Sequence, residues 1–109
     1  MNAVALPNGA DLLSFLGWSA SARNSALAAE HVEHVTELAE AYTRGKGFEG
    51  ERVDAAIARV IVSAAARSVS NPANAYRLEA GTVTATPARF EGWTLAEQTV
   101  LNRWRVRTN

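Results

Sequence analysis

Apolar residues recur at the i, i+3, i+4 spacing of an amphipathic helix in two long stretches of the chain. The clearer stretch runs from about Glu51 to Ser70 and ends at Asn71-Pro72, because the residue before a proline disfavours helical backbone. The other runs from near Ser21 to Arg44, with Gly45 placed at C′ to end it, and we predict that both are helices. The two stripes consist of Leu27, Val32, Val35, Leu38, Ala39 and Tyr42, and of Val53, Ile57, Val60, Ile61, Ala64, Ala65 and Val69.

Two shorter helices are predicted from the capping signals at their starts. Asn8, with Asp11 three residues later, suits the first turn of a helix that ends at Gly17. Thr94 and Glu97 have the spacing of a capping box, in which the two side chains bond each other's backbone N–H groups. A terminal helix is therefore expected after Thr94.

Two segments lack the helical period. Residues 46–50 are a predicted loop, because three glycines within six residues disfavour a helix. Residues 76–90 change to alternation, with threonines at 82, 84 and 86 separated by small apolar residues. This pattern predicts an extended ribbon or arm, which Pro87 confines to a sheet edge or an exposed position.

The predicted fold is mainly α, a small bundle of about four helices with a short extended ribbon or arm before the C-terminal helix. We expect a single domain over residues 1–109, with a helical core at about 8–72, the extended segment at about 76–90 and the C-terminal helix at about 94–107. The 22 alanines imply closely packed helices and a thin core. Assembly with other subunits is a natural way for such a chain to bury more apolar surface.

Composition excludes several classes of protein. The chain has 109 residues, of which 48% are hydrophobic and 20% charged, as in an ordinary globular domain. It contains no cysteine, which excludes a disulfide framework, a thiolate zinc site and a cysteine nucleophile. Lys plus Arg and Asp plus Glu number 11 each, so no net charge favours nucleic acid, a membrane or an acidic partner. Without signal-peptide features or a membrane-length apolar run, the chain is expected to be soluble and unprocessed.

No motif of catalysis or cofactor binding is present. The Gly-x-Ser-x-Gly, P-loop and dinucleotide-binding patterns do not occur in the sequence. His31 and His34 lie three residues apart among Glu30, Glu33 and Glu37, but without the Glu-x-x-His or His-Glu-x-x-His spacing of helical metal sites. We therefore predict no catalytic residue, metal or cofactor, and expect both histidines on a solvated helix face.

Charged residues form two stripes at helical spacing. The acidic stripe comprises Glu30, Glu33, Glu37 and Glu40. The basic stripe comprises Arg52, Arg59 and Arg67. These are either two solvated faces with weak ion pairs, or a contact between subunits in which one copy's acids meet a neighbour's arginines. In a third interpretation, the acids face a channel that must not hold DNA.

The C-terminal segment interleaves arginine with tryptophan. Arg103, Arg105 and Arg107 surround Trp104, and Trp93 precedes the predicted helix. Such residues bind nucleic acid through phosphate contacts and stacking, or anchor a protein interface. A basic last turn also suits the helix dipole on its own, and three arginines do not decide among these roles.

Two segments of the chain resemble a known family. Residues 41–48 read AYTRGKGF, residues 90–105 read FEGWTLAEQTVLNRWR, and an alanine-rich helix ending in Ser-Asn-Pro lies between them. In this order they resemble the head-to-tail connector (adaptor, or head-completion) proteins of long-tailed bacteriophages, especially those that infect actinobacteria. The resemblance covers roughly residues 10 to 107, and the second segment is its most specific part.

The resemblance implies a structural virion protein rather than an enzyme. Such proteins are small, mainly helical subunits of a ring, typically a dodecamer, beneath the portal of the filled capsid. The ring joins the portal protein to the next connector or tail-completion protein, and genomic DNA passes through its bore without sequence-specific binding. The protein would then lie at the head–tail interface of the virion, and in the host cytoplasm during assembly, with no membrane partner.

The resemblance also implies roles for particular residues. The extended stretch from Arg77 to Arg89 would pack on neighbouring subunits or line the ring. The portal-docking residues would be Trp93, Leu95, Leu101, Asn102, Arg103, Trp104, Arg105 and Arg107. Because two different faces of a subunit meet in a ring, the acidic and basic stripes would form the ring interface or line the channel.

The competing function is a small nucleic-acid-binding module, such as a phage or plasmid regulator. Such a module would use the C-terminal Arg/Trp tail on phosphates and bases, and its affinity would fall steeply with salt. The neutral total charge and the lack of a basic helix suited to a DNA groove favour the connector.

Overall fold

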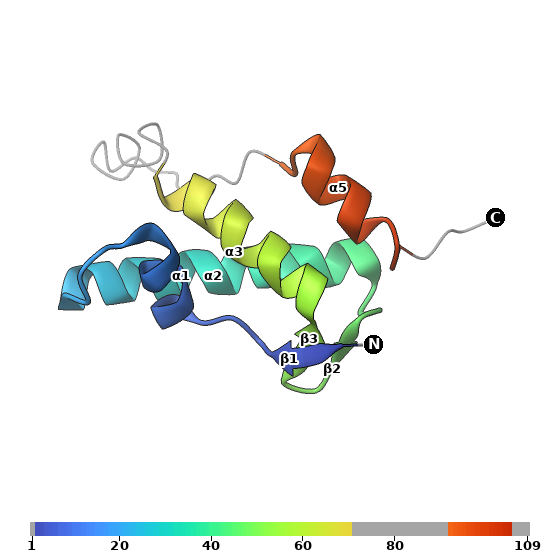
Figure 1. Ribbon diagram of the computed structural model, residues 1–109, viewed down its shortest axis with the longest axis horizontal. Helices are drawn as coiled ribbons and strands as arrows, with labels where there is room; N and C mark the ends of the chain where they lie inside the picture. The colour runs from blue at the N-terminus through green and yellow to red at the C-terminus, as the bar shows by residue number, and fades with distance from the viewer. Residues whose placement is uncertain (1, 71–91, 106–109) are drawn as a thin grey trace.

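Four helices and a small sheet make up the described part of the chain. The computed structural model describes residues 2–70 and 92–105. Its elements are β1 (Ala3–Ala5), α1 (Gly9–Leu16), α2 (Ala22–Thr43), β2 (Phe48–Glu49), β3 (Arg52–Asp54), α3 (Ala55–Val69) and α5 (Leu95–Leu101) (Figure 1). The mainly α fold class is confirmed. The predicted ribbon at 76–90 and Arg107 lie outside the described residues.

The core lies where the helices meet. α3 crosses in front of α2, α1 packs against both, and α5 lies beside α3 (Figure 1). The apolar stripes predicted for the two long helices supply the fully buried side chains at the crossing, among them Val35, Ile57 and Ile61. Gly9 lets α1 approach α2 closely, because a Cβ there would lie 2.9 Å from the backbone nitrogen of Ala29.

The ends of the first two helices follow local capping chemistry. At the start of α1, Asn8 Oδ1 accepts from Asp11 N at 2.9 Å, and Asp11 Oδ2 accepts from Asn8 N at 2.9 Å. Gly17 ends α1 in the left-handed region at φ 74°, as predicted. α2 begins after Ser21 and ends at Thr43, where Arg44 itself takes a left-handed conformation at φ 55°. The predicted cap at Gly45 is therefore one residue too late.

A three-stranded antiparallel sheet includes two residues of the predicted loop at 46–50, Phe48 and Glu49, while the rest of that loop is turn as predicted. Strand β3 replaces the predicted first turn of the next helix. The order of the sheet is β1-β3-β2, with Val4 opposite Val53 and Phe48 also opposite Val53. Val53, assigned above to the helical stripe, is fully buried in the central strand. Asp54 then caps α3, because its Oδ1 accepts from the N–H of Ala56 at 2.9 Å.

The last helix begins as predicted but ends earlier. The Thr94–Glu97 capping box is confirmed, with N–H···O distances of 2.9 and 3.1 Å. α5 ends at Leu101 instead of continuing toward residue 107. The chain tightens there into three-residue turns, since Arg103 N bonds Val100 O and Trp104 N bonds Leu101 O.

Candidate interaction surfaces

The four glutamates of the acidic stripe share the outward face of α2. Glu30, Glu33, Glu37 and Glu40 are all exposed. The opposite face of the helix packs into the core through Ala28, Val32, Val35 and Ala39. Within residues 2–70 and 92–105, none of the four glutamates forms a salt bridge. We call this face the acidic ridge. Its like charges repel one another by about 0.2–0.5 kcal/mol per adjacent pair, which an external cation would relieve.

The predicted basic stripe does not exist as one helical face. Arg52 lies on strand β3, and its Nη2 donates to the backbone oxygen of Ala3 at 2.6 Å. The cause is the sheet, which delays the start of α3 to Ala55. Arg59 is exposed on α3, whereas Arg67 is engaged within the chain. The basic stripe is thus reduced to Arg59 as an exposed helical arginine.

Arg67 ties α3 to α5 through Glu97. Arg67 Nη1 lies 2.8 Å from Glu97 Oε2, and Nη2 donates to Glu97 Oε1 at 3.0 Å and to the Gly92 oxygen at 2.8 Å. Ser63 Oγ donates to the same carboxylate at 3.1 Å. Burial by itself raises the pKa of Glu97, but the bonds from Arg67, the Thr94 backbone and Ser63 outweigh it and hold that pKa below its ordinary value. Glu97 is therefore a buried, ionised group that fixes the last helix.

The predicted portal-docking segment packs largely against its own chain. Leu101 is fully buried, so it is not free to enter a partner's groove. Trp104 is half-buried and packs against the core, close to Gly47 and Ile57. Leu101 and Trp104, both expected to dock on the portal, instead pack on their own core, because the turn after Leu101 folds Trp104 back onto it. Leu95, which is 81% exposed, and the exposed Arg103 still face solvent.

Tyr42 holds the C-terminal segment from α2. Its ring meets Trp93 edge-on, with centroids 6.3 Å apart and planes at 72°. Its hydroxyl donates to Asn102 Oδ1 at 2.7 Å, and the Arg105 guanidinium lies 5.3 Å from its ring centroid. Trp93, Asn102 and Arg105, all predicted to dock on the portal, thus contact one tyrosine of the AYTRGKGF segment.

His31 contradicts the expectation of a solvated histidine face. It is 4% exposed, and its Nδ1 lies 3.1 Å from Ser68 Oγ on α3. Burial lowers its pKa most; Glu30 raises that pKa and His34 lowers it further. His31 lies three residues after Ala28 and four before Val35, which are both buried, so helical spacing puts all three on one face. The prediction of a solvated histidine face did not use this spacing. Among the described residues, no three His, Cys, Asp or Glu side chains cluster as metal ligands.

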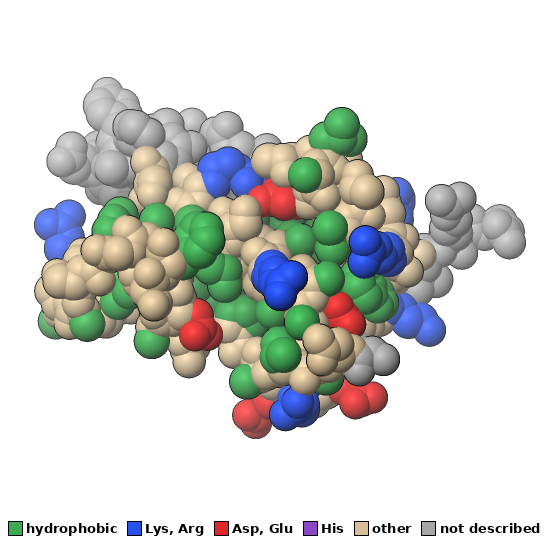
Figure 2. Space-filling model, in the orientation of Figure 1, with side chains coloured by type: hydrophobic (Ala, Val, Ile, Leu, Met, Phe, Trp, Pro, Cys, Tyr) green, Lys and Arg blue, Asp and Glu red, His purple; other side chains and the backbone are tan. Residues whose placement is uncertain are grey.

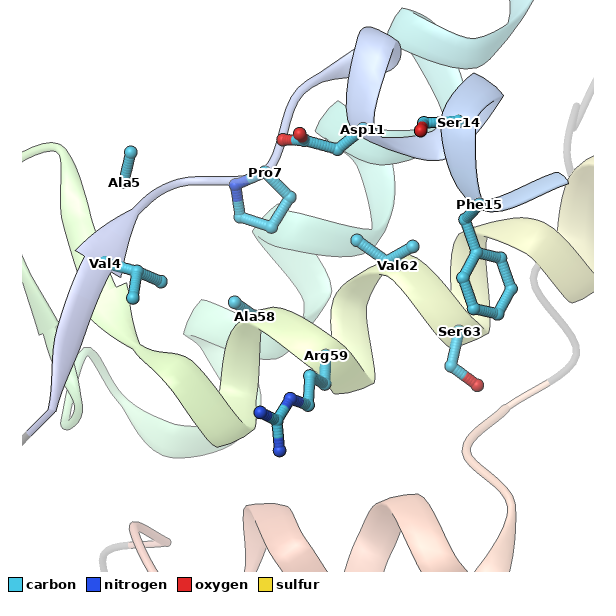
Figure 3. A pocket seen from close by; sticks show the side chains of 10 residues that line it. All are labelled: Val4, Ala5, Pro7, Asp11, Ser14, Phe15, Ala58, Arg59, Val62 and Ser63. Atoms are coloured by element: carbon cyan, nitrogen blue, oxygen red, sulfur yellow. The ribbon is translucent and has the colours of Figure 1, made fainter. Parts of the chain in front are cut away.

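An open, mainly apolar groove lies between the β1–α1 segment and α3. It encloses about 800 Å³ and is lined by Val4, Ala5, Pro7, Asp11, Ser14, Phe15, Ala58, Arg59, Val62 and Ser63 (Figure 3). Hydrophobic side chains gather on this side of the molecule (Figure 2). Phe15 is 62% exposed on the groove wall. Sequence reasoning missed the groove because the short strand β1, which builds one wall, carries no sequence pattern.

The described geometry defines a small helical domain with three exposed surfaces: the acidic ridge, the apolar groove and the outer side of α5. No protein-family model, curated protein or solved structure matches the chain. Within residues 2–70 and 92–105, no helix is both long and apolar enough to cross a membrane.

Proposed function

We propose that this protein is a head-to-tail connector subunit of a long-tailed bacteriophage. In this role it is a structural virion protein and not an enzyme. Copies form a ring, a dodecamer, beneath the portal protein, and join it to the next connector or tail-completion protein. The packaged genome passes through the bore without sequence-specific contacts.

One observation carries the proposal beyond sequence resemblance. The two segments with the strongest resemblance, residues 41–48 and 90–105, are about 50 positions apart in the chain, but residues 41–48 contact the described part of the second segment, residues 92–105. Tyr42 contacts Trp93 and Asn102, and Gly47 lies against Trp104. The residues behind the resemblance therefore form one structural unit, which makes a chance similarity of two separate short segments a poorer explanation.

The proposed contacts with other proteins use surfaces that are exposed in the fold. The exposed side of α5 and the turn after it, with Leu95 and Arg103, is the portal-facing surface. Trp104 packs on its own core beneath that surface and does not enter the portal. The threonine-rich segment at 76–90 is proposed, on its sequence alternation, to reach a neighbouring subunit.

Capture by a portal ring tests the proposal. Purified protein is mixed with the purified portal ring of the same phage, and the mass of the mixture is followed by light scattering at two salt concentrations. Many copies per portal ring are expected, and Arg103→Glu should weaken capture, whereas Glu49→Lys on β2 serves as a surface control. Absence of capture contradicts the connector. Salt-dependent binding of duplex DNA in the same buffer would instead favour the nucleic-acid-binding module.

A further inference from the structure

The acidic ridge and the apolar groove lie on opposite sides of the α2–α3 pair. The buried face of α2 packs on α1 and α3, so its glutamates face away from both helices. The buried face of α3 packs on α2 through residues such as Ile57 and Ile61, and the groove opens on the outer side of α3 at Arg59 and Val62 (Figure 3). One molecule therefore presents two unlike surfaces pointing in nearly opposite directions.

The two surfaces are complementary in charge. Arg59 lines the groove, is exposed, and has no acidic partner within salt-bridge distance among residues 2–70 and 92–105. The acidic ridge offers Glu33 and Glu37 with no basic partner in the same residues. Asp11 lies on the opposite wall of the groove from Arg59 (Figure 3). The outward face of α2 also carries an exposed arginine, Arg23, about two turns before Glu30 and about three to four turns before Glu33 and Glu37. The groove and the ridge thus each carry an arginine and at least one acid, so opposite charges can meet at both ends of a contact.

We propose that the groove of one copy receives the α2 ridge of a second copy. Glu33 and Glu37 of the ridge meet Arg59, and Arg23 meets Asp11. Ala26 and the methylene groups of Glu30 cover the apolar wall formed by residues such as Phe15 and Val62. An acidic partner is favoured over a purely apolar one, because an apolar occupant would bury Arg59 without a counter-charge.

The contact is head-to-tail, since groove and ridge are different surfaces. A heterologous contact forms a closed ring or an open filament according to the rotation between copies. Surfaces on nearly opposite sides place successive copies almost in line, so the ring of the proposed function requires a small rotation between neighbouring copies. The inference rests on the proposed function for the closure of that ring, but the contact itself can be tested without a portal.

Disulfide trapping tests the contact directly, because the chain contains no cysteine. Val62→Cys places a thiol in the groove, and Glu30→Cys or, separately, Ala26→Cys places one on the ridge. A mixture of groove and ridge variants should form mixed disulfide dimers under mild oxidation, whereas each variant alone should not. Glu49→Cys, exposed on β2 and outside both surfaces, is the control partner. The far-ultraviolet circular dichroism of each variant verifies that it is folded.

Charge exchange then tests the pairing. Arg59→Glu in the groove variant should slow mixed crosslinking about tenfold, because like charges then face each other. Glu33→Lys with Glu37→Lys in the ridge variant should restore it when mixed with the Arg59→Glu protein.

The proposal is overturned if neither ridge cysteine crosslinks above the Glu49→Cys level, or if Val62→Cys alone dimerises as fast as the mixture. Failure of crosslinking with normal portal capture would reject this contact and leave the connector function standing. Crosslinking without portal capture would reject the connector function and leave this contact standing.

Discussion

The link between α5 and α3 yields the most quantitative prediction. Arg67→Met removes the guanidinium from the Glu97 carboxylate and keeps much of the aliphatic stem. Removing one partner of a buried ion pair costs about 3–5 kcal/mol. Arg67 is 39% exposed, so water replaces part of the lost interaction, and Ser63 and the Thr94 N–H still bond the carboxylate. We therefore expect a loss of about 2 kcal/mol in the free energy of unfolding, or roughly 10 °C in melting temperature.

The same substitution should alter the pH dependence of stability. The pKa of Glu97 is lowered in the fold, so its contribution is present above the ordinary value of 4.5 and is lost as pH falls through the lowered value. Wild-type stability should therefore decline more steeply below pH 4.5 than that of Arg67→Met. Seven residues are too few for a helix in isolation, so detachment of α5 should also unfold it.

Urea denaturation followed by tryptophan fluorescence measures both effects, since Trp93 and Trp104 flank α5. Arg59→Met, measured in protein dilute enough that copies do not associate, is the matched control, because Arg59 is an exposed arginine on the same helix without an acidic partner in the described residues. The reasoning is refuted if Arg67→Met and Arg59→Met unfold at the same urea concentration at neutral pH.

Three further predictions concern packing, titration and docking. Gly47→Ala should lower the free energy of unfolding by about 2 kcal/mol or more in a denaturant titration. The added Cβ would lie 2.5 Å from Ile57 Cδ1, and the backbone φ of 85° is one that alanine disfavours. An unchanged denaturation midpoint would contradict the described packing. His31→Gln should make the protein lose less stability as the pH falls below 6.5. Burial lowers the pKa of His31, so the fold opposes its protonation, and glutamine removes that penalty. Melting curves measured across this pH range check the prediction, with His34→Gln as the exposed control. Leu95→Asp should leave the unfolding free energy within about 0.5 kcal/mol of wild type and reduce portal capture about tenfold, and equal capture would place docking elsewhere.

Most of the correct predictions rest on residues that lie close together in the sequence. The capping boxes at Asn8 and Thr94 involve residues three positions apart, so their geometry depends little on the rest of the fold. The acidic ridge followed equally from helical spacing alone. These features are encoded within one or two helical turns.

What escaped prediction depends on contacts between distant residues. β1 has three residues and gains its strand geometry from β3, with Ala3 paired to Asp54. That pairing delays α3 and removes Arg52 from the helix. Likewise, the partner of Arg67 lies 30 positions away, so no spacing rule could show that this arginine is already engaged. Leu101 was correctly seen as apolar, but whether its own core or a partner buries it was decided only by the three-dimensional packing.

The proposed connector is a ring subunit that docks on a portal. Light scattering of the purified protein with and without its portal ring tests it most directly. A connector subunit should give a complex whose mass exceeds that of the portal by many copies of the 11.7 kDa chain, with fewer copies when Leu95 is replaced by aspartate. A portal mass unchanged by excess protein, at both low and high salt, would contradict it.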